Sequence, residues 1–286
     1  MKFVAIDWGT SSFRAWLIEH DQVCGFIETD QGVKNFPDAS HNSYLSQVLS
    51  GWENQFNFIV SIGMIGSSIG LHETKFSNLP IGVKEVSTSL IKVPELNPPL
   101  YIVPGVSKSG DVMRGEESQS LAAHIDNGVV ILPGTHSKWV KIRDGKIVDF
   151  QTYLTGELFE LLRNNSTLSK ATDSSVKITA TKEFIEGLDA DVADLTHDLF
   201  TIRAKWLQGK SSEASREFLS GLLVGAEIKS GKAWCGSEKA TIVASEALAQ
   251  LYISALAHFG IMGTISDATN LIGYFVELAN EVEKQT

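Results

Sequence analysis

The stretch IDWGTSSFRAWL, from Ile6 to Leu17, places an acid, a Gly-Thr-Ser-Ser turn and an arginine between two apolar segments. Its centre, Gly9 to Ser12, has turn composition, and aromatic and β-branched residues flank it, so a β-hairpin is predicted. One interpretation is a surface hairpin in which Asp7 and Ser11 only satisfy the backbone of the turn. The other is a phosphate cradle, because consecutive N–H groups in such a turn bind anions and an acid at a strand end can hold a metal ion through water.

A second copy of the pattern favours the cradle. Residues 129–150, VVILPGTHSKWVKIRDGKIVDF, repeat the order of strand, Gly-Thr-x-Ser turn, strand with a basic residue, Asp-containing turn and third strand. The matching turn residues are Gly9, Thr10 and Ser12 in the first copy and Gly134, Thr135 and Ser137 in the second. Chance similarity of two hairpins could explain part of this match, since Gly and Thr are common in turns. Two Gly-Thr hairpins, each opening one half of the chain, are nevertheless what a duplicated nucleotide-binding fold would show, with one hairpin from each half closing on the phosphates of a nucleotide.

Composition restricts the class of protein. The 286 residues have room for two domains, and 43% apolar with 20% charged residues are ordinary globular values. A net charge of −10 argues against nucleic acid or an anionic membrane as the main partner. Cys24 and Cys235 are isolated, which predicts a reducing compartment and no disulfide or zinc site. No stretch approaches the ~20 apolar residues of a membrane span, so a cytoplasmic location is expected.

Strand and helix patterns alternate along the rest of the chain, which predicts an α/β fold. Strands are expected at residues 58–62 and 100–103, and a final strand, helix, strand, helix series after residue 240. Helices are expected at residues 40–54, from 115, and at 156–163, 181–188 and 215–229. The proline-rich segment 79–99 resists assignment. The sequence AKWLQGKS, residues 204–211, lacks the first glycine of a P-loop and is interpreted as a helix that ends at Gly209.

Six segments in this order resemble one family. They are IDWGTSSFRAWL, SIGMIGSSIG, DVMRGEESQSLAA, LPGTHSKWV, TGELFELL and FLSGLLVGAEI. Together they are similar to the 2-dehydro-3-deoxygalactonokinases, bacterial sugar-acid kinases of the actin, sugar kinase and heat-shock ATPase superfamily. The resemblance implies two ribonuclease-H-like (actin-like ATPase) domains, residues 1–113 and 114–286, around a central cleft. It also implies ATP and Mg²⁺, and phosphorylation of 2-dehydro-3-deoxy-D-galactonate at its 6-hydroxyl in galactonate catabolism.

The resemblance also implies roles for particular residues. Asp7 would position Mg²⁺. The terminal phosphates would be bordered by Gly9, Thr10, Ser11, Ser12 and Arg14 from the first hairpin and by Gly134, Thr135, His136, Ser137 and Lys138 from the second. The sugar-acid pocket would be walled by Trp8, Gly63, Met64, Ile65 and Gly66, and the adenosine site by Gly225 and Ser245. The catalytic group would comprise Arg114, Glu116 and Glu117. Glu116 is expected to be the base because related kinases place Gly-Asp where this chain has Gly115-Glu116, with Glu117 as the second candidate and Asp7 as the third.

Three questions stay open at this level. Ser245 and Glu246 stand where related kinases have glycines beside adenine, and Ser245 could instead cap a helix. Acids at a helix start could serve only the helix dipole. The alternatives in function are a kinase of the same fold for another sugar or sugar acid, and a non-catalytic actin-like nucleotide sensor, which would be expected to carry a further DNA-binding or partner-binding segment. Small molecules are the expected partners, and a homodimer is compatible with the sequence.

Overall fold

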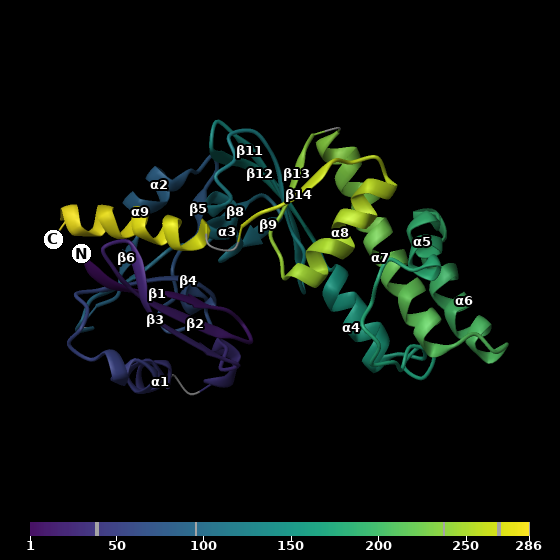
Figure 1. Ribbon diagram of the computed structural model, residues 1–286, viewed down its shortest axis with the longest axis horizontal. Coiled ribbons are helices and arrows are strands. Elements are labelled where there is room, and N and C mark those ends of the chain that lie inside the picture. Colours follow the sequence, from purple (N-terminus) through teal and green to yellow (C-terminus); the bar gives the residue numbers. More distant parts are fainter. Residues whose placement is uncertain (38–39, 95, 237, 268–269, 286) are drawn as a thin grey trace. The chain divides into compact units, whose positions relative to one another are not determined.

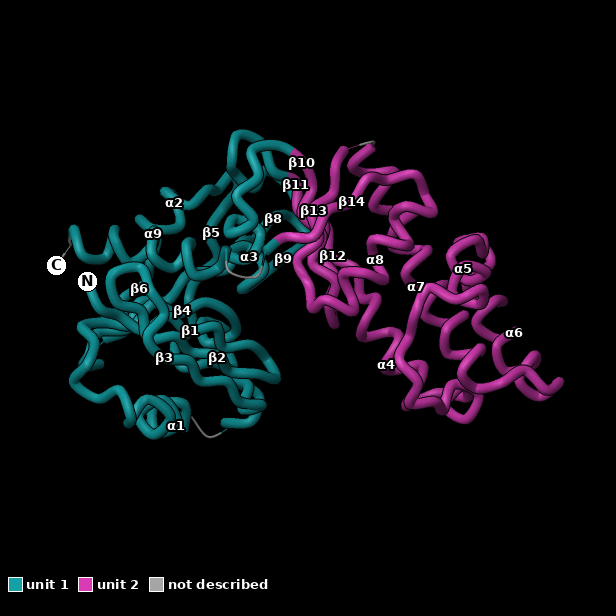
Figure 2. The backbone as a smooth tube through the Cα atoms, in the orientation of Figure 1, with its two compact units in different colours: residues 1–127, 142–149, 267–286 teal, residues 128–141, 150–266 magenta. Residues whose placement is uncertain are grey.

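The computed structural model describes residues 1–37, 40–94, 96–236, 238–267 and 270–285 as an α/β protein. Backbone contacts divide the chain into two compact units (Figure 2). Unit 1 comprises residues 1–127, 142–149 and 267–286, and unit 2 comprises residues 128–141 and 150–266. The resemblance implied a single boundary after residue 113. The division into units differs from it, because residues 114–127 and the C-terminal segment belong to unit 1.

The sheet of unit 1 has the strand order β3-β2-β1-β4-β7-β6. The strands are β1 (Lys2–Trp8), β2 (Phe13–Glu19), β3 (Gln22–Thr29), β4 (Ile59–Gly63), β6 (Ile91–Lys92) and β7 (Leu100–Ile102). Strand β1 runs antiparallel to β2 and parallel to β4, which is parallel to β7. Because β1 and β4 are central and covered on both faces, both are almost continuously apolar and buried.

The second sheet repeats this topology with the order β12-β11-β10-β13-β14. Its strands are β10 (Gly128–Leu132), β11 (Ser137–Arg143), β12 (Lys146–Tyr153), β13 (Ala240–Ile242) and β14 (Gly263–Ile265). Strand β10 is parallel to β13, and β13 is parallel to β14. Three consecutive strands followed by two parallel ones therefore occur twice, in agreement with the duplication predicted from the two Gly-Thr hairpins.

The described part of unit 1 also contains four α-helices, three short 3-10 helices and a small sheet. The α-helices are α1 (His41–Val48), α2 (Val83–Thr88), α3 (Glu116–Ala122) and α9 (Asn270–Gln285), and the small sheet has the order β5-β8-β9, formed by Ser77–Asn78, Val106–Lys108 and Asp111–Met113. Helix α9, yellow in Figure 1, packs against α2, α3, β1 and β4. Tyr274, Phe275 and Leu278 are fully buried on its apolar face, so the last helix of the chain completes the core of the first unit.

The helices of unit 2 are α4 (Thr155–Asn165), α5 (Lys182–Asp189), α6 (Leu195–Leu207), α7 (Ser212–Cys235) and α8 (Glu246–His258). Helices α5 and α7 approach each other closely through glycines. A Cβ on Gly221 would lie 2.0 Å from the Phe184 carbonyl oxygen, and one on Gly225 would lie 2.8 Å from the Leu188 Cα and carbonyl oxygen. Gly225 therefore allows this helix packing, and its expected place at the adenosine site stays a prediction.

The helix and strand predictions differ from the structure in identifiable places. The expected helix at 40–54 ends at Val48, and that at 215–229 extends over Ser212–Cys235. The unassigned segment 79–99 contains α2 and β6. The sequence of α6 has no clear hydrophobic periodicity, because apolar residues occur on its exposed side as well as on its buried side. Phe200 and Leu207 are exposed, while Ile202 is buried. The predicted helix end is confirmed, because α6 stops at Leu207 and Gly209 has a φ of +103°. In the described residues, no helix is long and apolar enough to cross a membrane.

Candidate functional site

Asp7 and Arg14 face each other on neighbouring strands at the start of unit 1. They are register partners in the β1–β2 pair, and Arg14 Nη2 donates to Asp7 Oδ2 at 2.5 Å. Asp7 is only 7% exposed, and this burial raises its pKa, while the charge and hydrogen bond of Arg14 and a hydrogen bond with Gln119 act in the opposite direction. The pair places a carboxylate, stabilised by one cation, at the end of a buried strand.

The first hairpin is held in place by its backbone, which leaves its side chains at the surface. Gly9 N–H donates to the Ser12 carbonyl at 2.9 Å, and Val33 N–H donates to the Gly9 carbonyl at 3.0 Å. Thr10, Ser11 and Ser12 are exposed. The hairpin can therefore contact a ligand without rearranging the core.

Glycines allow three backbone segments to converge beside Asp7. Gly63, at the end of β4, has a φ of +90°, and a Cβ there would lie 2.7 Å from the Trp8 carbonyl oxygen and 3.3 Å from Asp7 Oδ1. Gly115, before α3, has a φ of +103°, and a Cβ there would lie 3.1 Å from Gly63 Cα. Only glycine satisfies both the left-handed backbone and the contact distance at these two positions.

The two acids at the start of α3 have opposite environments. Glu116 is partly exposed, and its Oε2 accepts from the Arg114 backbone N–H at 3.0 Å. Glu117 is fully buried, and its carboxylate accepts from the Gly115 N–H at 2.7 Å and from the Ser118 hydroxyl at 3.1 Å. Burial, together with the charge of Glu116, raises the pKa of Glu117 to about 8. Glu116 is therefore the acid of this pair that a ligand can reach.

Arg114 binds the loop of unit 1 that contains Thr74 and Phe76. Its guanidinium donates to Thr74 Oγ1 at 2.6 Å and to the Thr74 carbonyl at 3.0 Å, and it stacks over the Phe76 ring at 4.5 Å. A Cβ on Gly66 would lie 2.9 Å from Arg114 Nη1. These contacts position the turn after β4, which does not by itself make Arg114 a catalytic group.

Two residues predicted to wall the sugar-acid pocket have side chains inside the core. Trp8 is fully buried, with its indole N–H donating to the Gln31 carbonyl at 3.0 Å, and Ile65 is also fully buried. Neither side chain is exposed, so a contact of Trp8 or Ile65 with the sugar acid would have to come from its backbone. Of the two residues that flank Ile65, Met64 is partly exposed and Gly66 is buried.

The second hairpin, in unit 2, divides into an exposed and a buried part. Gly134, Thr135 and His136 are exposed, whereas Ser137 and Lys138 are buried. The Ser137 hydroxyl donates to Glu227 at 2.6 Å, and the Lys138 ammonium donates to Thr152 at 2.9 Å. Both side chains are turned into the unit, so the expected place of Ser137 and Lys138 in the phosphate loop would depend on their backbone groups and stays a prediction.

Helix α4 begins directly against this hairpin. The Glu157 backbone N–H donates to the Thr135 carbonyl at 2.9 Å, and the Glu157 carboxylate lies 2.6 Å from His136 Nε2. A Cβ on Gly156 would lie 2.3 Å from the Gly134 carbonyl oxygen. The exposed part of the hairpin is therefore held in place by contacts with the first turn of α4.

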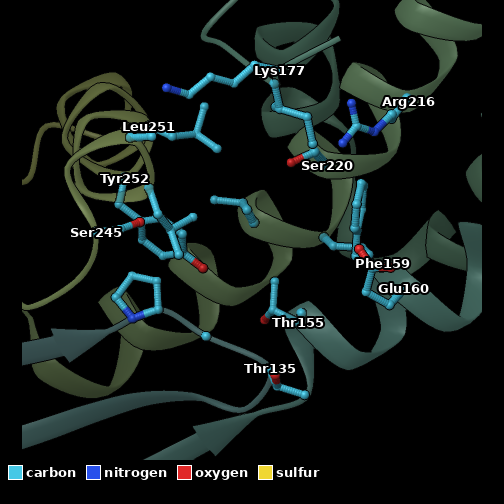
Figure 3. A pocket seen from close by; sticks show the side chains of 18 residues that line it. Thr135, Thr155, Phe159, Glu160, Lys177, Arg216, Ser220, Ser245, Leu251 and Tyr252 are labelled. Atoms are coloured by element: carbon cyan, nitrogen blue, oxygen red, sulfur yellow. The ribbon is translucent and has the colours of Figure 1, made fainter. Parts of the chain in front are cut away.

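A pocket of about 410 Å³ lies entirely within unit 2 (Figure 3). The second hairpin, the start of α4, helix α7 and the start of α8 form its walls. Its lining is mainly apolar and includes Phe159, Leu223, Val224, Leu248 and Leu251, with polar groups from Thr155, Lys177, Arg216, Ser220, Ser245 and Tyr252. Ser245 occupies the N-cap position of α8 without a side-chain capping bond. A mainly apolar pocket beside a polar hairpin suits a nucleoside whose phosphates lie at the hairpin.

Sequence reasoning missed several polar residues here. Glu227, on α7, is fully enclosed and bonded to Thr155 and Tyr252, and Gln119 is bonded to Asp7. A signal for Glu227 was present, because it is an acid within the otherwise apolar run LLVGAEI. Its partners could not be predicted, since they come from β11, α4 and α8, which are distant in the sequence.

The repeated sheet topology and the two hairpins define a protein of the actin-like ATPase and sugar kinase fold. A solved activator of 2-hydroxyisocaproyl-CoA dehydratase from Clostridium difficile, with bound ADPNP, has this fold, with a TM-score of 0.52 over 100% of this chain and 97% of that one at 10% identity.

The particular family follows from the sequence comparison. Residues 7–273 match the family 2-keto-3-deoxy-galactonokinase. The 2-dehydro-3-deoxygalactonokinase of Escherichia coli (strain K12) is 32% identical over 269 residues, 91% of this chain and 90% of that protein. A Sinorhizobium meliloti structure assigned to the same activity has a TM-score of 0.90 at 30% identity over 99% of both chains. The chain belongs to the 2-keto-3-deoxy-galactonokinase family and is a carbohydrate kinase.

Proposed function

We propose that the protein transfers a phosphoryl group from ATP to the 6-hydroxyl of 2-dehydro-3-deoxy-D-galactonate, giving 2-dehydro-3-deoxy-6-phospho-D-galactonate in galactonate catabolism. The observation that carries this proposal is the family match over residues 7–273, which includes both hairpins and the acids of α3. Small molecules are then the partners of the site. A cytoplasmic location and a homodimer stay predictions.

Glu116 is proposed as the general base. Its carboxylate is partly exposed, next to Gly115, and therefore accessible to a substrate hydroxyl. Removing the hydroxyl proton as the bond to phosphorus forms is the task of a carboxylate in this chemistry. Glu117 is unsuited to it, because it is enclosed and holds a proton at neutral pH.

Asp7 is proposed to position Mg²⁺. Among the described residues, no group of three or more His, Cys, Asp or Glu side chains is arranged as a metal site. Mg²⁺ is commonly bound by one or two carboxylates together with substrate phosphates, so a single carboxylate at a strand end, with Gly63 leaving space beside Oδ1, fits this ion. When bound, the ion neutralises charge on the phosphates.

The exposed residues of both hairpins are proposed to bind the phosphates of ATP. These are Thr10, Ser11 and Ser12 in unit 1, and Gly134, Thr135 and His136 in unit 2, and the partly exposed Gly9 is proposed to bind with them. The nucleoside would occupy the unit 2 pocket, with Ser245 at its wall. The backbone of residues 63–66 and the side chain of Met64 would contact the sugar acid, so that each unit supplies part of the machinery.

An ATP-consumption assay tests the function. We expect 2-dehydro-3-deoxy-D-galactonate to be phosphorylated with a kcat/KM well above those of its epimers and of plain hexoses. A panel of 3-deoxy-2-keto acids and glucose should be compared under identical conditions, with the phosphorylated position determined by NMR. A higher kcat/KM for another sugar acid would replace the substrate, and the absence of any turnover would indicate a nucleotide sensor.

A further inference from the structure

One carboxylate, that of Glu227, binds two of the polar residues that line the unit 2 pocket, Thr155 and Tyr252, and also two residues of the strand after the second hairpin. Glu227 lies on α7 and is fully enclosed. Its Oε1 accepts from the Ser137 hydroxyl at 2.6 Å and from the Trp139 indole N–H at 2.9 Å. Its Oε2 accepts from the Thr155 hydroxyl at 2.5 Å and from the Tyr252 hydroxyl at 2.9 Å. These donors belong to β11, α4 and α8, so one side chain joins the strand after the second hairpin to both helices beside the pocket.

The bonds to Glu227 determine whether the hydroxyls that line the pocket can donate a hydrogen bond to a ligand or only accept one. A hydroxyl has one hydrogen to donate and two lone pairs to accept. Thr155 and Tyr252 both line the pocket, and both donate to the Glu227 carboxylate. Burial raises the pKa of Glu227, while the hydrogen bonds from Ser137, Thr155, Trp139 and Tyr252 lower it and so stabilise the ionised form that accepts from both hydroxyls. Their oxygens therefore present only lone pairs to a ligand. At this wall, a ligand group that donates a hydrogen bond is favoured, and one that only accepts is disfavoured.

We propose that Glu227 is a positioning residue that makes this wall an acceptor surface and thereby selects the hydrogen-bond donors of the bound nucleoside. The inference rests on the proposed placement of ATP in unit 2. Adenosine offers two kinds of donor, the ribose hydroxyls and the 6-amino group of adenine. Phosphate oxygens are acceptors, so this wall contacts the nucleoside, and the phosphates remain at the exposed part of the hairpin.

Glu227→Gln should exchange the acceptor and donor roles of the Thr155 and Tyr252 hydroxyls while keeping their contacts with residue 227. The Trp139 indole N–H can only donate, so the amide oxygen of glutamine must take the Oε1 position. The amide NH₂ then faces Thr155 and Tyr252, whose hydroxyls accept from it and release their own hydrogens. The wall thus changes from an acceptor surface to a donor surface while the volume and packing are retained.

The experiment measures binding of four nucleotides to the full chain by calorimetry, without sugar acid. The probes are ATP, 2′-deoxy-ATP and 3′-deoxy-ATP, which lack a ribose donor, and ITP, in which a carbonyl replaces the 6-amino group. For the wild type we expect at least one analogue to bind about 5- to 20-fold more weakly than ATP, which identifies the donor. In Glu227→Gln that preference should shrink to about 2-fold or less, with the KM for the sugar acid unchanged.

Glu217→Gln is the matched control. Glu217 is a buried glutamate on the same helix that accepts from the Thr181 hydroxyl at 2.7 Å, and it does not line the pocket. This variant should keep the wild-type preference. If Glu227→Gln does not fold, Tyr252→Phe and Thr155→Val each remove one acceptor, and at least one of them should lose the preference.

The outcomes separate the two proposals. A wild type that phosphorylates the sugar acid but binds all four nucleotides equally overturns the role of Glu227 alone. The role of Glu227 is also overturned if Glu227→Gln keeps the wild-type preference for ATP over the analogues, or if Tyr252→Phe and Thr155→Val both keep it. A wild type that binds none of the nucleotides overturns the proposed function, and this inference with it.

Discussion

The guanidinium of Arg14 donates to the carboxylate of Asp7 at 2.5 Å across the β1–β2 pair, at directly opposed register positions. Arg14 thus compensates for the burial of the carboxylate proposed to position Mg²⁺. Burial raises the pKa of Asp7, and Arg14 is the largest influence that lowers it. The ionised form that a cation requires therefore depends on this arginine.

Replacing Arg14 by methionine should raise the pKa of Asp7 further, because the compensating charge and hydrogen bond are lost while an unbranched apolar side chain remains. Ionisation of Asp7 then needs a higher pH. We expect the acidic limb of the kcat/KM profile to move to higher pH, and more Mg²⁺ to be needed for half-maximal rate. Arg14→Lys should shift both the acidic limb and the Mg²⁺ requirement part of the way back to their wild-type values. Identical pH profiles for wild type and Arg14→Met would show that Asp7 does not act through its charge.

Replacing Glu116 by glutamine tests the base. The amide oxygen can still accept from the Arg114 N–H, so the start of α3 should keep its form, but the amide cannot take up the hydroxyl proton. We expect kcat to fall roughly 10²–10⁴-fold, with calorimetric affinities for ATP and the sugar acid near those of the wild type. Turnover within a few-fold of the wild type would mean that the base lies elsewhere.

Glu117 should make stability depend on pH. Its pKa is about 8 in the folded protein against 4.5 for the free side chain, so the folded state holds a proton that the unfolded state has lost between these values. Stability from this group is therefore complete below about pH 4.5 and is lost as the pH rises through about 8.

Glu117→Gln removes this titration, since its amide is neutral at every pH. We expect the variant to exceed the wild type in free energy of unfolding by on the order of 1–3 kcal/mol at pH 9, with the difference largely gone at pH 5. Denaturant unfolding at the two pH values measures it, and kcat should change far less than in Glu116→Gln. A difference that is the same at pH 5 and pH 9 would contradict the raised pKa.

Gly156→Ala tests the support of the second hairpin. The added Cβ would lie 2.3 Å from the Gly134 carbonyl oxygen, so α4 or the hairpin must move. We expect a loss of roughly 1–3 kcal/mol in stability and a higher KM for ATP, with less effect on the KM for the sugar acid. Gly273→Ala is the control, because in helix α9 its Cβ would meet nothing within 4 Å, and it should stabilise by about 0.5–1 kcal/mol. Equal stabilities and KM values in the two variants would show that the contact is unimportant.

Local patterns were sufficient to predict the duplicated architecture. The hairpin residues and the order of strands and helices depend on turn chemistry and hydrophobic periodicity, which neighbouring residues express without help from the rest of the chain. The acids at the start of α3 and the glycines at 63 and 115 were recognisable for the same reason, since a turn after a strand and a helix start have their own compositions.

Tertiary structure decided which side chains face a ligand. Trp8 and Ser137 stand in the two hairpin motifs, yet the first is enclosed in the core and the second is bonded to Glu227, which is 90 positions further along the chain. Likewise Glu116 and Glu117 are neighbours of the same type, and only burial separates an accessible carboxylate from one that keeps its proton. Sequence alone determined the two hairpins and the strands and helices with clear periodicity, because these follow from local backbone preferences. The accessibility and charge state of each group depend on partners brought from distant segments, and only the folded chain places those partners.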